Sequence, residues 1–355
     1  MPPDFPPDLL QASVAIHERS VVVDMHHDIA EDVIRRRQLG EDDVLRRIWL
    51  PRLRTAGIKV QVFPIFIDSS FLPEMALRRE LAMIHYLLDE FDRNAEEVLL
   101  ARDFKDIEAG LASGKLVAIL ALEGAEAIDA ELTILGILHR VGVRMASLTW
   151  NRRTIFADGA DKRHGAAGLT SAGLEMIKRM EKLKIVVDVS HLSDKSFWDV
   201  LEATEKPMIA SHSNARSLCD HPRNLTDEQS RAIAGRRGLI GILIHPAVIN
   251  PLKPTISSVV DHIAYLADLV GVDHVGLGTD FIADLSGLEH TPTKEWMMPP
   301  ELAHSTIPGL AGSVDLPNLT AEMLRRGFAS DDIVKVLGTN VLRVLRDAWG
   351  AESSF

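Results

Sequence analysis

The sequence predicts an α/β fold, a single (β/α)8 TIM barrel over residues 1–355 with a short N-terminal lead-in and closing C-terminal helices. Three observations predict it. Short, almost wholly apolar runs recur along the chain, as expected of strands buried on both faces. Longer segments of helical periodicity separate these runs, which favours parallel βαβ units. The runs number eight, and eight parallel strands close a barrel of this kind.

The expected strands are all short and rich in Val, Ile and Leu. They cover 20–25, 59–66, 116–123, 144–150, 185–190, 207–211, 239–244 and 274–280. An open doubly wound sheet is the alternative, because the same alternation of strands and helices also builds that fold.

Helical periodicity is clearest in three segments between the strands, at 77–94, 171–183 and 257–271. The last of these begins at a serine cap and ends at a glycine, as helices often do. Residues 318–349 predict two closing helices with a turn at 338–340. The segment 284–317 is either a lid or a dimer contact, and composition does not decide between them.

Composition excludes several classes of partner. A formal charge of −12 argues against nucleic acid or an anionic membrane surface. The single cysteine, Cys219, provides neither a disulfide framework nor a thiolate zinc site. The N-terminus lacks the basic and apolar regions of a signal peptide, and no apolar run approaches the ~20 residues of a membrane span. We therefore expect a cytoplasmic protein, with a homodimer as a possible assembly.

Charged and imidazole side chains follow five of the apolar runs directly. They are His26 and Asp28, Glu123, His191, His212 and Asp280. In a barrel, the C-terminal strand ends meet at one rim, where active sites lie. His26 and Asp28 are two residues apart, so both point to the same side of an extended strand. Two histidines, an aspartate and a shareable glutamate suit one or two divalent ions such as zinc.

Each of these residues alone has a simpler interpretation. A histidine after a strand is more often a hydrogen-bonded loop residue than a ligand, and a carboxylate there often caps the next helix. The joint pattern favours a metal, because burying several unpaired charges at one rim is costly and a cation removes that cost. His245, at the end of the seventh run, is a candidate substrate-pocket residue.

At these positions the sequence resembles the membrane (renal) dipeptidase family of the amidohydrolase superfamily. The family's D-G-H-N-D motif corresponds to Asp24-Met25-His26-His27-Asp28, and its E-G-G motif to Glu123-Gly124-Ala125. Four further motifs follow in the family's order: Asp188-Val189-Ser190-His191, the S-H-S to R-N block from Ser211 to Asn224, Gly278-Thr279-Asp280-Phe281, and Gly338 to Arg343.

The resemblance implies a role for each matching residue. His26 and Asp28 would hold one metal ion, His191 and His212 a second, and Glu123 would bridge both of two zinc ions. Asp280 would be the catalytic acid/base and would also lie against the substrate. Arg223 would bind the terminal carboxylate of the substrate, a role that the resemblance alone implies. The expected reaction is hydrolysis of a dipeptide by a metal-bridged hydroxide, with a D-residue tolerated at the C-terminal position.

One departure from the family concerns the position after the fourth strand. Many members have a histidine there, in L-T-H, that stabilises the oxyanion, whereas this chain has Leu148-Thr149-Trp150. Trp150 is therefore either a substrate-binding residue or packing at the barrel mouth, and Asn151, Arg152 or Arg153 could take over the histidine's role. The departure keeps open an amidohydrolase acting on another small amide, N-acyl amino acid or lactone. A metal-bearing binding module without catalysis is a third possibility, against which Asp280 argues.

Overall fold

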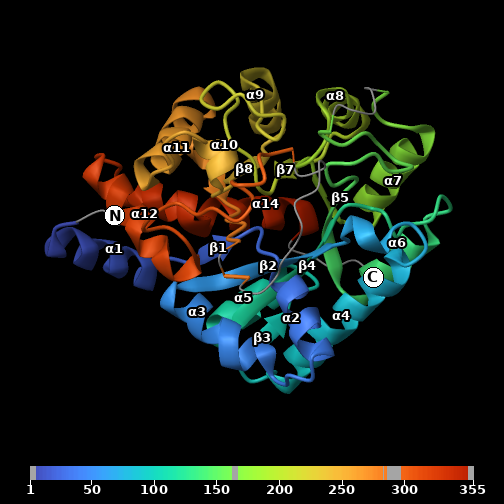
Figure 1. Cartoon of the computed structure of the whole chain (residues 1–355), viewed down its shortest axis with the longest axis horizontal. Helices are drawn as coiled ribbons and strands as arrows, with labels where there is room; N and C mark the ends of the chain where they lie inside the picture. The colour runs from blue at the N-terminus through green and yellow to red at the C-terminus, as the bar shows by residue number, and fades with distance from the viewer. Residues whose placement is uncertain (1–4, 162–166, 283, 286–296, 351–355) are drawn as a thin grey trace.

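The computed structural model describes residues 5–161, 167–282, 284–285 and 297–350 of the chain. The predicted barrel is confirmed: strands lie in the middle of the molecule and helices surround them (Figure 1). The strands are β1 Val22–Asp24, β2 Ile58–Phe66, β3 Val98–Leu100, β4 Leu116–Glu123, β5 Val143–Ser147, β6 Val186–Asp188, β7 Met208–Ala210, β8 Leu239–Ile242 and β9 Val275–Leu277. The predicted segment 284–317 falls partly outside the described residues, at 286–296.

The eight barrel strands pair in parallel in the order β1-β2-β4-β5-β6-β7-β8-β9. The seam between β9 and β1 is joined by the N–H of Met25, which donates to the Leu277 carbonyl at 2.9 Å. Each of the eight predicted runs overlaps one of these strands, and β2 and β5 begin one residue before their runs. Most of the strands are shorter than the runs, so the polar residues at the ends of the runs lie on or just beyond the strand ends.

Strand β3 is not among the predicted runs. It pairs with the first residues of β4, whereas β5 pairs with later residues of the same strand. Strand β3 therefore lies toward the N-terminal end of the barrel, away from the strand ends that carry the polar residues. Its three residues are too few to give a recognisable pattern in sequence.

The helices alternate with the strands. They are α1 Pro7–Arg19, α2 Ile29–Gln38, α3 Leu50–Thr55, α4 Ala76–Arg93, α5 Phe104–Ala112, α6 Thr133–Val141, α7 Ser171–Lys182, α8 Asp194–Ala203, α9 Asp227–Gly235, α10 Pro246–Ile249, α11 Ile256–Val270, α12 Leu316–Arg325, α13 Ser330–Val334 and α14 Asn340–Trp349. Helices α4, α7 and α11 match the predicted segments to within one residue. The predicted serine cap of α11 is wrong, because the Thr255 hydroxyl accepts the Ser258 N–H and caps the helix instead.

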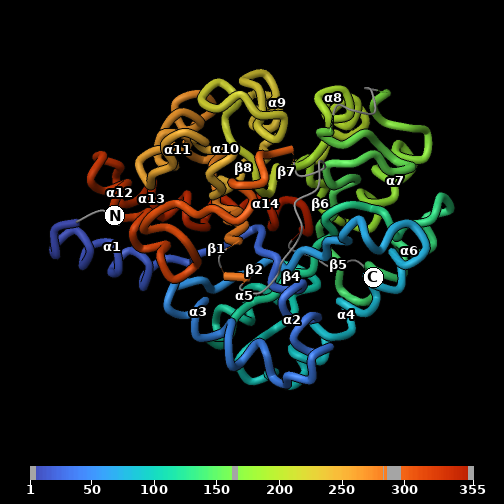
Figure 2. Tube along the Cα trace, viewed as in Figure 1, coloured from blue at the N-terminus to red at the C-terminus, as the bar shows by residue number. Residues whose placement is uncertain are grey.

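The C-terminal region contains α12, α13 and α14 rather than two helices, because Gly327 with φ of 84° ends α12 early. Helices α1 and α12, which lie far apart in the sequence, pack against each other, as the adjoining blue and red tubes of Figure 2 show. There His17 Nε2 lies 2.7 Å from Thr320 Oγ1.

The barrel interior forms one apolar cluster with residues of α14. Val23, Val62 and Ile119 from the strands belong to the same buried cluster as Val341 and Val344 of α14. Since α14 also binds the starts of the strands, with Arg343 donating to the Asp273 and Arg237 carbonyls, it closes the N-terminal end of the barrel. The C-terminal rim therefore remains the place for a site. No helix of the described part of the chain has the length and apolar character to cross a membrane.

Candidate metal centre

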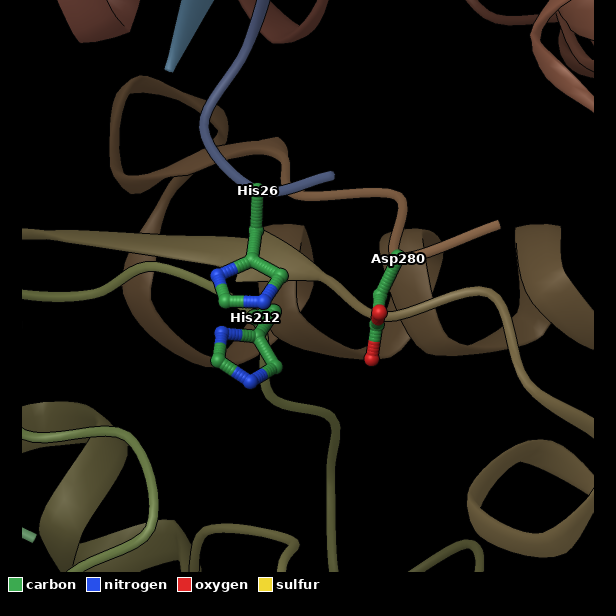
Figure 3. A group of neighbouring side chains, drawn as sticks. All are labelled: His26, His212 and Asp280. Carbon is green, nitrogen blue, oxygen red and sulfur yellow. The ribbon is translucent and has the colours of Figure 1, made fainter. Parts of the chain in front are cut away.

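The structure brings the predicted ligands together at the C-terminal rim. Three groups of potential metal ligands form there, and within each group one ligand atom per residue lies within 4.8 Å of the others. The groups are His26, Asp28 and Glu123; Glu123, His191 and His212; and His26, His212 and Asp280. Figure 3 shows the third group, with the two imidazoles stacked and Asp280 beside them.

Glu123, the last residue of β4, lies between the two sides of this cluster. Its Oε1 is 2.9 Å from His191 Nε2 and 3.6 Å from His212 Nε2, while its Oε2 is 3.5 Å from His26 Nε2. Asp28 Oδ1 approaches the same His26 nitrogen at 3.9 Å. The carboxylate thus presents one oxygen to each of two neighbouring ligand sets, which is the arrangement expected of a bridging ligand.

Hydrogen bonds determine which ring nitrogens of two histidines carry protons. Asn151 Oδ1, which can only accept, lies 2.7 Å from His191 Nδ1, so Nδ1 donates and His191 Nε2 is bare. Ser211 gives its single hydroxyl proton to Asp188 Oδ2 at 2.5 Å, and its oxygen therefore accepts from His212 Nδ1 at 2.8 Å. His212 Nε2 is bare as well.

These two bare Nε2 atoms lie only 2.7 Å apart, and both face Glu123 Oε1. Lone pairs that converge without a proton between them repel one another, and a cation converts the repulsion into ligation. Buried His26 Nε2 and Asp28 Oδ1 also lack any hydrogen-bond partner. The residues present therefore fit divalent metal ions of the kind that imidazole and carboxylate ligands bind.

Burial and the mixture of charges shift the pKa values of the cluster. Burial lowers the pKa of His191 to about 3 and also lowers that of His212, so both imidazoles are neutral, as ligation requires. Burial opposes charge on His26, but Glu123, Asp280 and Asp28 outweigh it and raise its pKa to about 10. The three carboxylates around His26 therefore favour a positive charge at this position.

Asp280 lies on the turn after β9, with φ of 52° in the left-handed region. Its N–H donates to the His26 carbonyl at 2.9 Å, and the preceding residue, Thr279, donates both its N–H and its hydroxyl to Asp24. These bonds hold the carboxylate against the ligand cluster. Burial and the neighbouring Glu123 raise the pKa of Asp280, which makes it able to hold a proton.

Arg223 is 7% exposed and lies next to the cluster. Its Nη2 donates to the His212 carbonyl at 3.0 Å. Burial lowers its pKa to about 10 although Glu123 and Asp280 act in the opposite direction. A buried guanidinium at the rim is suited to binding a carboxylate.

Trp150 lies at the mouth, where its ring is 5.9 Å from that of His191 and 5.0 Å from that of Phe66. The three residues that follow it are engaged elsewhere. Asn151 binds His191, Arg152 pairs with Glu126 at 2.9 Å and reaches the Ile67 carbonyl, and Arg153 lies 3.3 Å from Asp158. Each of these side chains thus has another partner, and the expectation that one of them takes over the role of the family's histidine stays a prediction. His245 caps α10 by accepting the Ala247 N–H at 3.2 Å.

The sequence analysis did not predict the role of three residues in orienting the candidate ligands. Asp188 and Ser211 orient His212, and Asn151 orients His191. The sequence contained a signal, because Asp188 and Ser211 end strand runs beside predicted ligands. Their partners come from neighbouring strands, which a linear pattern does not show.

The fold and the site together define a (β/α)8 barrel of the metallohydrolase class, with a carboxylate between histidine ligands at the C-terminal rim. The sequence profile of the membrane dipeptidase family (Peptidase family M19) matches residues 10–354. The chain belongs to this family.

Named relatives include two fungal dipeptidases. Dipeptidase tcpJ of Claviceps purpurea is 31% identical over 81% of this chain, and the match spans 64% of the fungal protein, slightly under two thirds of its length. Dipeptidase aclJ of Aspergillus oryzae is 29% identical over 93% of this chain and 78% of its own.

A similar crystal structure is that of a metallopeptidase from Rhodobacter sphaeroides, solved with a phosphinate mimic of the dipeptide L-Ala-D-Ala. It is 26% identical with a TM-score of 0.80, over 93% of this chain and 100% of that one. The dipeptidase AC, a metallopeptidase of family M19, is 28% identical with a TM-score of 0.81. The match covers 94% of this chain and 100% of that one.

Proposed function

We propose that this chain is a dipeptidase that uses two divalent metal ions, preferably zinc. The observation that carries the proposal is the placement of Glu123, whose two oxygens face different histidines on the two sides of the cluster. A single ion needs no such division, whereas two ions sharing a carboxylate do.

The residues fall into two ligand sets around this glutamate. His26 and Asp28 would hold one ion, and His191 and His212 the other. When bound, ions in such a pair supply an activated water and polarise the carbonyl of the scissile bond.

Asp280 would act as the acid/base. Its carboxylate lies in the same group as His26 and His212, and its raised pKa lets it take a proton and return it to the leaving amine. Arg223 would bind the free carboxylate of the substrate, because it is a buried cation beside the ligands. A carboxylate anchor this close to the reacting bond restricts the substrate to very short peptides.

A D-residue at the C-terminal position is part of the proposal. The support is the Rhodobacter sphaeroides relative, which was solved with a mimic of L-Ala-D-Ala. Dipeptides of the L,L and L,D series are therefore the first substrates to assay.

A second candidate is hydrolysis of another small amide, an N-acyl amino acid or a lactone. Trp150 favours this second candidate, because its indole lies beside His191 at a position where many members of the family have a histidine. An indole has one N–H donor and cannot be protonated, so it serves a developing oxyanion less well than an imidazole.

A substrate screen with measured metal content separates these candidates. We expect close to two zinc equivalents per chain after mild dialysis and turnover of dipeptides. Rapid lactone hydrolysis without dipeptide turnover would favour the second candidate. Trp150→His is the matched variant: it should raise dipeptide turnover if the position serves the oxyanion, and it should leave the metal content unchanged.

A further inference from the structure

We propose that Asn151 is a positioning residue for the metal ligand His191, and that residues 149–161 of the loop after β5 thereby help to build one of the two ion sites. The inference rests on the proposed two-metal function. It concerns a residue that neither the motifs nor the ligand geometry assign to the site.

The side-chain contact is short and buried. Asn151 is 3% exposed and His191 is 5% exposed, and Asn151 Oδ1 lies 2.7 Å from His191 Nδ1. Because an amide oxygen only accepts, this bond fixes the imidazole as the tautomer with its proton on Nδ1. It leaves Nε2 bare and directed at Glu123 Oε1, 2.9 Å away. A hydrogen bond to the distal nitrogen of a ligand imidazole orients the ring and raises its basicity.

The same loop also holds the backbone of His191. The His191 carbonyl accepts from the Ala160 N–H at 2.7 Å and from Thr149 Oγ1 at 3.3 Å. His191 has a φ of 67°, in the left-handed region that a β-carbon disfavours. Contacts from the surrounding structure must hold such a conformation. The loop supplies three of them, two to the carbonyl and one to the ring.

The loop is itself closed tightly at Asn151. The Asn151 carbonyl accepts the Asp161 N–H at 2.8 Å, and a β-carbon on Gly159 would lie 2.3 Å from that carbonyl oxygen. Only glycine permits this approach. The position of the Asn151 backbone is therefore set by packing within the loop.

His212 is held by a different part of the molecule. Its Nδ1 bonds Ser211, which bonds Asp188 at the end of the neighbouring strand β6. The two histidines of one ion site thus depend on separate supports, a loop amide for His191 and a strand-borne hydroxyl and carboxylate for His212. Removing Asn151 should release His191 and leave His212 in place.

The test compares Asn151→Leu with Asn151→Asp in the full-length protein. Leucine is close in size to asparagine and removes the acceptor, whereas aspartate retains an acceptor for Nδ1–H. Competition with a chelator should show one of two zinc ions bound about 10- to 100-fold more weakly in Asn151→Leu. The other zinc ion should keep its affinity, and Asn151→Asp should bind both ions as the unmodified chain does.

A second measurement does not involve metal. Nitrogen-15 NMR of labelled histidines in the zinc-free protein should show His191 with its proton on Nδ1, and this signature should be lost in Asn151→Leu and kept in Asn151→Asp. If leucine prevents folding, as circular dichroism would reveal, Asn151→Ala takes its place.

Unchanged affinity for both ions together with an unchanged His191 tautomer in the leucine variant would overturn the inference. Equal weakening of both ions would also overturn it, because it would indicate a general loss of structure. If the unmodified chain binds fewer than two ions, the proposed function fails, and the tautomer measurement still tests the role of Asn151.

Discussion

His191 Nε2 and His212 Nε2 lie 2.7 Å apart at the rim of the barrel, and the partners of both rings leave these nitrogens without protons. Two neutral imidazoles do not adopt this arrangement for their own stability, since their lone pairs face each other. The surrounding hydrogen bonds impose it. The site is in this sense preorganised for a cation, and the energy of the arrangement is recovered when one binds.

Replacement of Glu123 should affect both ions together. Glu123→Ala removes oxygens that face His26 on one side and His191 and His212 on the other. We expect the loss of at least one zinc ion per chain and a fall in kcat/KM of about 10³-fold or more, because several kcal/mol of charge stabilisation depend on the metals. Metal analysis and steady-state kinetics check this. A Glu123→Ala protein that retains both ions would contradict the bridging role.

Asp280→Asn should separate proton transfer from metal binding. The amide keeps the shape of the side chain but cannot accept and return a proton, so we expect kcat to fall about 10²- to 10⁴-fold. Zinc content should remain close to that of the unmodified chain. Asp261→Asn, at an exposed surface ion pair, is the control and should be fully active. Unchanged turnover and pH profile in Asp280→Asn would instead favour a binding module without catalysis.

Arg223→Met should act through the carboxylate of the substrate. Removing a buried charged donor costs about 1.5–3 kcal/mol, so kcat/KM for dipeptides should fall by about 10- to 100-fold. Dipeptide amides lack the carboxylate and should be affected much less. An equal loss with both substrates would show that Arg223 serves the fold, through its bond to the His212 carbonyl, rather than substrate binding.

Glu80 should make stability depend on pH. Burial and the neighbouring Glu126 raise the pKa of Glu80 from 4.5 to about 8. A carboxyl whose pKa is raised in the folded state stabilises the fold fully below its unfolded pKa, and this contribution is lost as the pH rises through the folded pKa. The stability of the unmodified protein should therefore decrease between pH values of about 4.5 and 8.

Denaturant unfolding of the Glu80→Gln variant checks this. The amide cannot ionise, so the variant should lose less stability than the unmodified protein between pH 5 and pH 9. An identical loss in both proteins would show that Glu80 does not titrate in this range. The comparison needs no activity assay, and both proteins are measured in the zinc-free form, because bound metal adds its own pH-dependent stability.

The candidate ligand set could be predicted from the sequence for a local reason. Charged and imidazole side chains stand directly after apolar runs, and parallel strands bring their C-terminal ends to one rim. His26 and Asp28 follow β1, and Glu123 ends β4, so their convergence needed only the number and direction of the strands. The position of Arg223 came from the resemblance to a known family and not from any pattern in the residues.

The sequence by itself indicated eight parallel strands, with an open sheet as the alternative to a barrel, and the polar side chains expected at their C-terminal ends, because these follow from apolar periodicity and from chain direction. Only the tertiary structure decided how the ligands are held. Asn151 reaches His191 across forty positions of sequence, and Asp188 acts on His212 through Ser211. The tertiary structure also decided that Arg152 forms an ion pair with Glu126. Such contacts join side chains on separate strands and loops, and their geometry is fixed by packing in three dimensions, for which a linear pattern contains no signal.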